Sequence, residues 1–178
     1  MKTFLKFTIG IFLCCQIPMF VMAAEQADDR VKTALESAEI QFTETKSHDF
    51  RMEIKTTEDR TNLVFVNSDT QTDGEYEHRE VWAVACSFGD VRDANYSANR
   101  SEGYDYNQLL GRLMSRNSGH QTGGFQVAKD SESQWKSLVV YSAVVPADAP
   151  GELLKAVIDA CAFNADMLEA EWTMQDKR

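Results

Sequence analysis

The sequence predicts an α+β fold, in which an antiparallel sheet of about five to six strands carries helices packed on one face. Apolar residues recur at helical spacing in three separate segments, and short strand-like segments lie between these helices. Successive strand-like segments have short connections, which favours antiparallel pairing. Strand runs divided by single helices are typical of α+β domains, so the expected order is α-β-β-β(-β)-α-β-β-α.

Each expected helix has an apolar stripe and polar residues near its ends. Asp28 and Asp29 precede the first stripe, where acidic residues suit the positive end of the helix dipole. Pro150 lies near the start of the third helix, a position at which proline is tolerated. The expected helices cover residues 26–39, 106–117 and 149–172.

The expected strands show alternation of apolar and polar residues or a continuous apolar run. Within 50–55, Phe, Met and Ile alternate with Arg, Glu and Lys, as in a strand with one buried face. Polar residues at 130–133 separate two further strands, which predicts a hairpin over 124–145. The strands before that hairpin are expected at 40–43, 50–55, 63–66 and 81–88.

The first 23 residues are expected to be a cleavable signal peptide. Lys2 and Lys6 precede a charge-free apolar run, and Val21-Met22-Ala23 has the small-residue pattern of a cleavage site. The run is short for a membrane span and contains Gln16 and Pro18. Residues 24–178 then form one domain, which we expect to be periplasmic or secreted.

The charge balance disfavours several classes of partner. The chain has 18 basic and 28 acidic residues, a net charge of −10, and loss of residues 1–23 would leave −12. Nucleic-acid binding needs a basic surface, so we expect no nucleic-acid partner. An anionic membrane surface is disfavoured for the same reason, and no membrane association is expected after signal cleavage.

Cys86 and Cys161 are the two cysteines that remain after signal cleavage, and both lie in apolar patterns. An oxidising compartment favours a disulfide between them. The alternative is two buried thiols that behave as small hydrophobic residues. Both interpretations remain open, because the sequence does not provide the distance between the two Cα atoms.

Residues 69–80 match the spacing of an EF-hand calcium loop. Oxygen-bearing side chains stand at the first, third and fifth positions, Gly74 at the sixth and Glu80 at the twelfth. Gln71 replaces the usual acid or asparagine, and the flanking segments are expected to be strands. The favoured interpretation is therefore a hairpin that turns at Asp73-Gly74.

The polar segment 89–106 is expected to be a long loop between a strand and a helix. Its acids and aromatic residues form a candidate partner-binding surface, because long loops often carry function. The alternative is a solvated connection without a binding role. The candidate residues are Asp90, Asp93, Tyr96, Tyr104 and Tyr106.

No known catalytic or metal-binding motif is found in the sequence. The three histidines are scattered, and a structural zinc site wants four cysteine or histidine ligands. Neither a phosphate-binding glycine loop nor a nucleophile elbow is present. We therefore expect no cofactor, no metal and no catalytic residues, and an enzyme with an unrecognised site is the least favoured alternative.

The chain resembles the YbjN-like family of bacterial proteins, whose fold is similar to that of type III secretion chaperones. The resemblance spans about residues 30–172 and is carried by the segments 107–117, 124–127, 138–141 and 153–168. It implies a non-enzymatic regulator or chaperone-like module that binds a protein partner and is often a homodimer. The alternative is an envelope protein that binds a small molecule or calcium through 69–80 or 89–106.

Overall fold

The structure, a computed structural model, describes residues 26–57, 59–87, 106–119, 123–129 and 137–173. These residues form three helices and seven strands. The elements are α1 (Asp29–Ser37), β1 (Thr43–Glu44), β2 (Phe50–Lys55), β3 (Thr61–Val66), β4 (Gln71–Asp73), β5 (Tyr76–Ser87), α3 (Tyr106–Asn117), β6 (Gly124–Lys129), β7 (Ser137–Pro146) and α4 (Gly151–Thr173).

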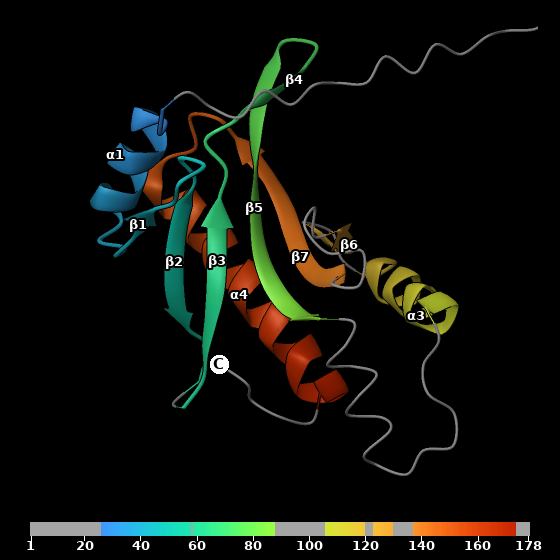
Figure 1. Cartoon of the computed structure of the whole chain (residues 1–178). Helices are drawn as coiled ribbons and strands as arrows, with labels where there is room; N and C mark the ends of the chain where they lie inside the picture. The colour runs from blue at the N-terminus through green and yellow to red at the C-terminus, as the bar shows by residue number, and fades with distance from the viewer. Residues whose placement is uncertain (1–25, 58, 88–105, 120–122, 130–136, 174–178) are drawn as a thin grey trace, which may run out of the picture.

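The strands form one antiparallel sheet in the order β1-β2-β3-β5-β7-β6, and β4 pairs with the first residues of β5 (Figure 1). The predicted α+β class and element order are confirmed. The sheet has seven strands instead of five to six, because β1 and β4 are very short strands that have weak sequence patterns. The long strand β5 lies at the centre, between β3 and β7.

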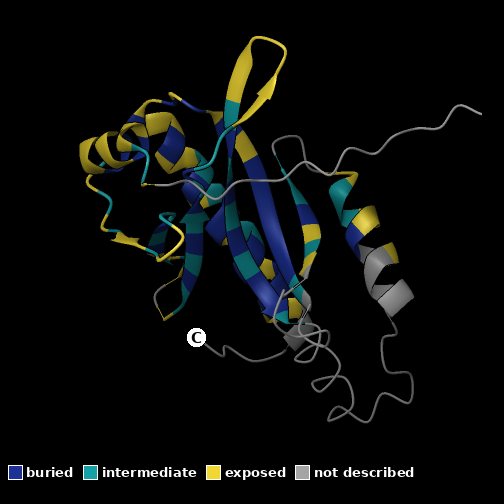
Figure 2. Cartoon of the chain, turned by 45° about the horizontal axis from the view of Figure 1, so that its top comes forward, coloured by how far each residue is buried: buried dark blue, intermediate teal, exposed yellow. Residues whose placement is uncertain are grey.

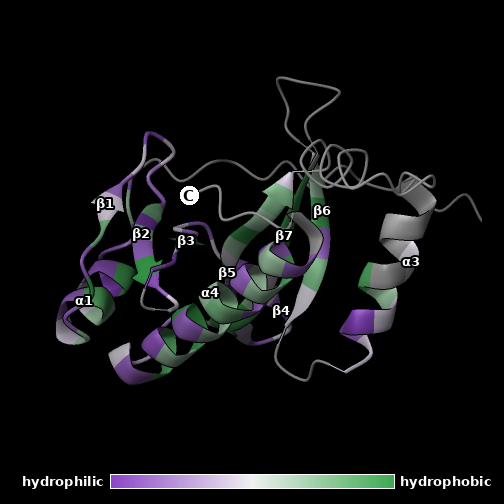
Figure 3. Cartoon of the chain, turned by 90° about the horizontal axis from the view of Figure 1, so that it is seen from below, coloured by the Kyte–Doolittle hydropathy of each residue, from purple (hydrophilic) through white to green (hydrophobic). Residues whose placement is uncertain are grey.

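Helix α4 crosses one face of the sheet and covers β5, β7 and β3 (Figure 3). Helix α1 packs beside α4, whereas α3 lies against the edge strand β6. Alternate residues of β5 are therefore buried under α4, as the dark blue bands along the strands show in Figure 2. No described helix covers the opposite face of the sheet (Figure 1), and we call it the open face.

The segment at 40–43 differs from the predicted strand. Glu39 has a left-handed backbone (φ 57°), and the Ile40 N–H donates to the Leu35 carbonyl at 3.0 Å. The Glu39 N–H donates to the Glu36 carbonyl, and the two hydrogen bonds together form a Schellman cap. Ile40 thus belongs to the cap that follows α1, and it packs against the core instead of starting a strand.

Candidate partner-binding surfaces

An apolar band crosses the open face of the sheet. Phe65 on β3 and Trp82 on β5 are register partners, and their rings stack at 4.2 Å with an interplanar angle of 12°. The Trp82 indole donates to the Asn67 side chain at 2.8 Å, which fixes the orientation of the ring. Both rings are partly exposed, so this stack presents aromatic surface to solvent.

Further apolar residues extend the band on both sides of the aromatic stack. Val84 on β5 is partly exposed and stands opposite the buried Val140 on β7, whereas Val144 of β7 stands opposite Glu80. Val144 is 61% exposed, which is unusual for a valine in a central strand. Leu63, Phe65, Trp82, Val84 and Val144 together are named the open-face band.

Polar side chains border the open-face band. Arg51 and Glu53 form an ion pair at 2.9 Å on β2, and Gln126 on β6 donates to Glu80 at 3.0 Å. An apolar centre with a polar border is the usual anatomy of a protein interface. The open face therefore has the composition of a binding surface for another protein.

Helix α4 has a second apolar side, which faces away from the sheet. One side of the helix is buried in the core. On the other side, Leu153, Phe163 and Met167 are 42%, 52% and 48% exposed. Ala156, Ala160 and Ala170 lie between or beside them at alternating intervals of three and four residues. We name these six residues the α4 seam, because their spacing is that of a coiled-coil seam.

The ends of α4 are fixed to the rest of the fold. Near the C-terminal end, Arg60 pairs with the Asp166 carboxylate at 2.8 Å and donates to the Asp166 carbonyl at 2.9 Å. Arg116 of α3 pairs with Glu171. At the other end, Gly151 packs so closely on α1 that a Cβ atom would meet the Ala34 carbonyl at 2.6 Å. The α4 seam thus lies on a rigid element.

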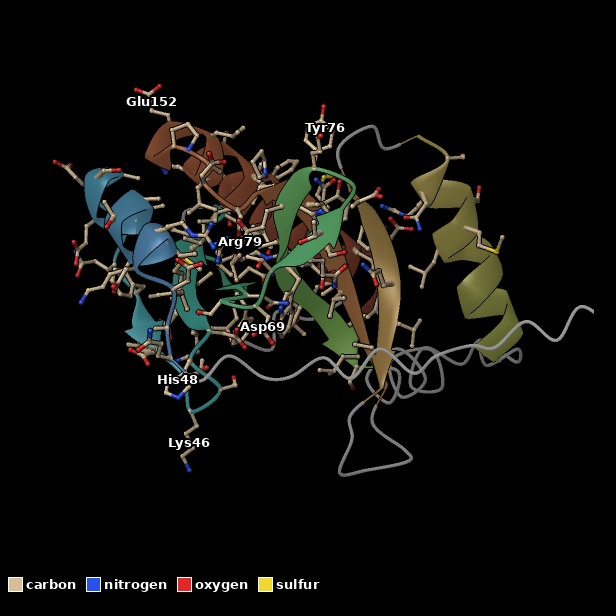
Figure 4. All side chains as sticks on the ribbon, turned by 90° about the horizontal axis from the view of Figure 1, so that it is seen from above. Lys46, His48, Asp69, Tyr76, Arg79 and Glu152 are labelled. Carbon is tan, nitrogen blue, oxygen red and sulfur yellow. The ribbon has the colours of Figure 1, made fainter. Side chains whose placement is uncertain are left out.

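A network of charged residues joins α1 to the end of the sheet, and Figure 4 labels one of its members, Arg79. The Arg79 side chain is only 1% exposed and pairs with Asp28 at 2.7 Å. It also donates to the carbonyls of Ala147 at 2.9 Å and Asn67 at 3.0 Å. Arg30 bridges Asp28 and Glu77, at 2.8 Å from each. Every charge in this network therefore has a partner of opposite sign.

These contacts shift the pKa values of the acids in the network. Burial alone would raise the pKa of the Asp28 carboxyl, but hydrogen bonds from Arg30 and Arg79 hold it well below its usual range. Hydrogen bonds from Arg30 and Thr70 lower the pKa of Glu77 to about 2. A carboxylate that is paired in this way stays ionised, so the network is typical of a structural clamp.

Residues 69–80, which match the calcium-loop spacing, form a β-hairpin that projects from the sheet (Figures 2 and 4). Asp73 pairs with Tyr76, so the turn residues are Gly74 and Glu75, one position later than the predicted Asp73-Gly74, and Gly74 has φ +63°. Glycine at this first turn position is typical of a type II′ turn. Glu77 binds Arg30 whereas Glu80 binds Gln126, so the oxygens of the motif diverge.

Most of the predicted loop site at 89–106 lies outside the described residues. Asp90, Asp93, Tyr96 and Tyr104 belong to that part of the chain. Tyr106 is the first residue of α3, and its side chain is not described. The proposed role of this segment in binding stays a prediction.

The two cysteines are both buried but are kept apart by the sheet register. The Cys161 thiol donates to the Val81 carbonyl at 3.6 Å, whereas Cys86 lies five residues further along β5. Five residues of strand span about 17 Å, and a disulfide needs Cα atoms within about 7 Å. Of the two interpretations that the sequence leaves open, the structure has the second, because both residues are buried free thiols.

The thiol of Cys161 lies in an apolar environment. Burial, with a smaller contribution from Glu80, raises its pKa to about 12. Since the thiolate is the reactive form of cysteine, this residue is expected to be inert in the folded protein. Its role is to pack α4 on β5.

Among the described residues, no group of three or more histidine, cysteine or acidic side chains could hold a metal ion. Across the same part of the chain, no helix has both the length and the apolar character needed to cross a membrane.

The α4 seam and the open-face band were not identified as sites from the sequence. The alternation Phe65-Val66 and Trp82-Ala83 indicates strands, but it does not show which face is left uncovered. For α4, the apolar stripe predicts the buried side: five of its residues are buried and Val157 is partly buried against the core, the full set being Leu154, Val157, Ile158, Cys161, Ala165 and Leu168. A second set of large apolar residues, Leu153, Phe163 and Met167, also lies at helical spacing in the sequence. This spacing could have indicated a second apolar side of the helix.

Comparison with known proteins identifies no family model and no curated protein that matches the chain. A solved structure, that of YbjN from E. coli, described as a proposed transcription regulator, is similar with 10% sequence identity and a TM-score of 0.46. The similarity covers 80% of this chain and 90% of YbjN. A score of this size establishes neither a shared family nor a shared function.

Proposed function

We propose that this protein is a non-enzymatic protein-binding module, chaperone-like or regulatory, that acts in the periplasm or outside the cell after removal of residues 1–23. The open-face band carries this proposal. A sheet with one face covered by a helix and the other face uncovered normally has polar residues on the uncovered face. Here that face presents a stacked aromatic pair and a valine that is 61% exposed.

An apolar band on the open face lowers the solubility of the protein unless a partner covers it. Aromatic residues at the centre of such a surface provide most of the binding energy in protein interfaces. The ion pair Arg51–Glu53 and the Glu80–Gln126 hydrogen bond supply a polar rim. These features fit a protein partner better than a small molecule, because the surface is broad and belongs to three neighbouring strands.

The side chains with shifted pKa values in the described structure support a non-enzymatic role, because they are engaged in contacts that hold the fold. A hollow between α1 and the start of α4 is lined by Arg30, Thr33, Ser37 and Asp148. Arg30 already binds Asp28 and Glu77, so its charge is used to hold the fold. The shifted pKa values of Asp28 and Glu77 have the same structural origin, and they give no reason to invoke acid–base chemistry.

The test is site-specific photocrosslinking in the native bacterium, with a photoreactive amino acid in place of Val144. Tyr76, at the tip of the β4–β5 hairpin, provides a control position that is more exposed, at 80% against 61% for Val144. We expect a discrete crosslinked protein from position 144 and none from position 76. A second sample is fractionated to locate the protein. The absence of a crosslink at position 144, or recovery in the cytoplasm with residues 1–23 intact, would overturn the proposal.

A further inference from the structure

We infer that the α4 seam is a docking surface for a basic amphipathic helix of another protein. Such a helix has apolar residues along one side and lysine or arginine residues at the borders of that side. This inference goes beyond the proposed function and does not use the open face. It rests on the exposed apolar side chains of α4, on the acids beside them and on the fixed position of the helix.

The apolar side chains of the seam form a strip that is long enough for a docked helix. Steps of three and four residues from Leu153 to Ala170 keep six side chains on one side of α4 for about 26 Å. An ordinary surface helix has polar residues on this side. Within the described part of the chain, the three large members of the seam remain between 42% and 52% exposed. The strip therefore offers a partner helix a contact along several turns.

The sizes of the seam residues suit a helix that lies along α4. Three of the six residues are alanines, and small residues let two helix backbones approach closely. Phe163 lies near the middle of the strip, and an exposed aromatic residue at the centre of a contact surface is a common anchor in protein interfaces. Met167 follows one turn later, and its flexible side chain adapts to partner side chains of different shapes.

Acidic residues stand beside the seam along its length. Each of three acids is four residues away from a seam residue, so the two side chains are neighbours on the helix surface. These neighbours are Glu152 and Ala156, Asp159 and Phe163, and Glu171 and Met167. All three acids are exposed, and Figure 4 shows the Glu152 side chain projecting away from the fold. The seam is thus an apolar strip with an acidic border.

The basic residues near this border neutralise it only in part. Lys155 pairs with Asp159 at 3.0 Å, and Arg116 of α3 pairs with Glu171. In both pairs the acid is about half exposed, and surface ion pairs of this kind are weak, so a partner's basic side chain can share or replace the contact. Glu152 makes no ion pair with any residue in the described part of the chain. The border therefore has negative charge available for lysine or arginine residues of a partner.

The same charges argue against two other occupants of the seam. An anionic lipid surface would be repelled by the border and by a chain with a net charge of −10. The α4 helix of a second copy would bring a border with the same three acids, so like charges would meet across the contact. A basic amphipathic helix instead covers the apolar strip and places opposite charges beside the acids.

The test is a titration of the purified protein into a fluorescein-labelled synthetic peptide of leucine and lysine, followed by fluorescence anisotropy. The peptide has about 18 residues, with leucines at helical spacing on one side and lysines on the other, so its helix has the length of the seam. A second peptide has glutamate in place of every lysine. Contact along one helix is a small interface, so we expect a micromolar dissociation constant for the lysine peptide. The glutamate peptide should bind at least about tenfold more weakly.

Two substitutions locate the binding on the seam, each with a matched control. Phe163→Ala should weaken binding of the lysine peptide by about tenfold because it removes the central anchor, whereas Tyr76→Ala removes an exposed aromatic side chain elsewhere and should have no effect. Glu152→Lys should weaken binding of the lysine peptide by about threefold and strengthen binding of the glutamate peptide. Glu75→Lys makes the same change in net charge at the tip of the β4–β5 hairpin and should affect neither peptide. Circular dichroism checks that each variant is folded.

Absence of binding to the lysine peptide at millimolar concentration, or equal binding of the two peptides, would overturn the inference. Equal effects of Glu152→Lys and Glu75→Lys would also overturn it, because binding would then depend on net charge and not on the border of the seam. Loss of binding in Val144→Asp but not in Phe163→Ala would place the helix on the open face. Crosslinking from Val144 in cells does not depend on any of these results, so failure of this inference and failure of the proposed function are distinguished.

Discussion

Replacement of Asp28 should destabilise the fold more than replacement of any exposed acid, because Arg79 would lose its charge partner. The Arg79 side chain is 1% exposed and the Asp28 side chain 15% exposed, with 2.7 Å between the charged groups. Breaking a buried pair from one side costs about 3–5 kcal/mol. Arg79 would keep its hydrogen bonds to the Asn67 and Ala147 carbonyls, so we expect about 3 kcal/mol for Asp28→Asn.

A second variant separates the ion pair from the helix cap. Asp28 is also the N-cap of α1, and its Oδ1 accepts from the Arg30 N–H at 2.8 Å. Asparagine can keep this hydrogen bond, whereas alanine cannot, and an N-cap contributes about 1 kcal/mol. Asp28→Ala should therefore cost about 4 kcal/mol, out of a total stability of about 5–15 kcal/mol for a single domain.

Urea unfolding followed by circular dichroism measures these differences, provided that the slope of free energy against urea is the same for each variant. Glu53→Gln is the matched control, because it removes an exposed carboxylate from a surface ion pair and should cost below about 1 kcal/mol. A cost below about 1 kcal/mol for Asp28→Asn would refute the reasoning, since it would mean that the buried charge of Arg79 does not depend on Asp28 for its stabilisation.

Three further predictions test the clamp, the contact between helices and the buried thiol. Because the folded pKa of Asp28 is depressed, its contribution to stability is full above about pH 4 and is lost as the pH falls towards the folded value. Urea unfolding at a series of pH values should therefore show a steeper loss below about pH 4 for the natural protein than for Asp28→Asn. Gly151→Ala should cost about 1–3 kcal/mol in thermal or urea unfolding, because the new methyl would meet the Ala34 carbonyl at 2.6 Å. Gly111→Ala, where a methyl meets nothing within 4 Å, should stabilise slightly, and equal effects of the two changes would contradict the packing argument. Cys161 should resist iodoacetamide at about pH 8 until urea unfolds the chain, as peptide mass spectrometry would show, and rapid labelling of the native protein would contradict its raised pKa of about 12.

Local pattern was sufficient to predict the fold class, the three described helices and the longer strands, but not the short strands β1 and β4. The helices at 29–37, 106–117 and 151–173 have apolar residues at helical intervals, and β2 alternates residue by residue. The hairpin at 69–80 was also favoured by its turn residues over a calcium loop. These features depend on neighbours within a few positions along the chain, and the sequence therefore shows them directly.

The tertiary structure determines which sides of the predicted helices and strands are covered by other elements. Arg79 follows the same alternation as Val81 and Ala83, but its burial depends on Asp28, 51 residues away in sequence. Likewise, the separation of Cys86 from Cys161 follows from the point at which α4 crosses β5.

Both apolar surfaces proposed as binding sites arise in the same way. The sequence alone indicates that Trp82 and Phe163 belong to a strand and a helix with apolar sides. Helix α4 packs with one side on one face of the sheet. The other apolar side of the helix and the other face of the sheet are therefore exposed to solvent. Sequence periodicity determines that an element has an apolar side, whereas long-range packing determines whether that side becomes core or surface.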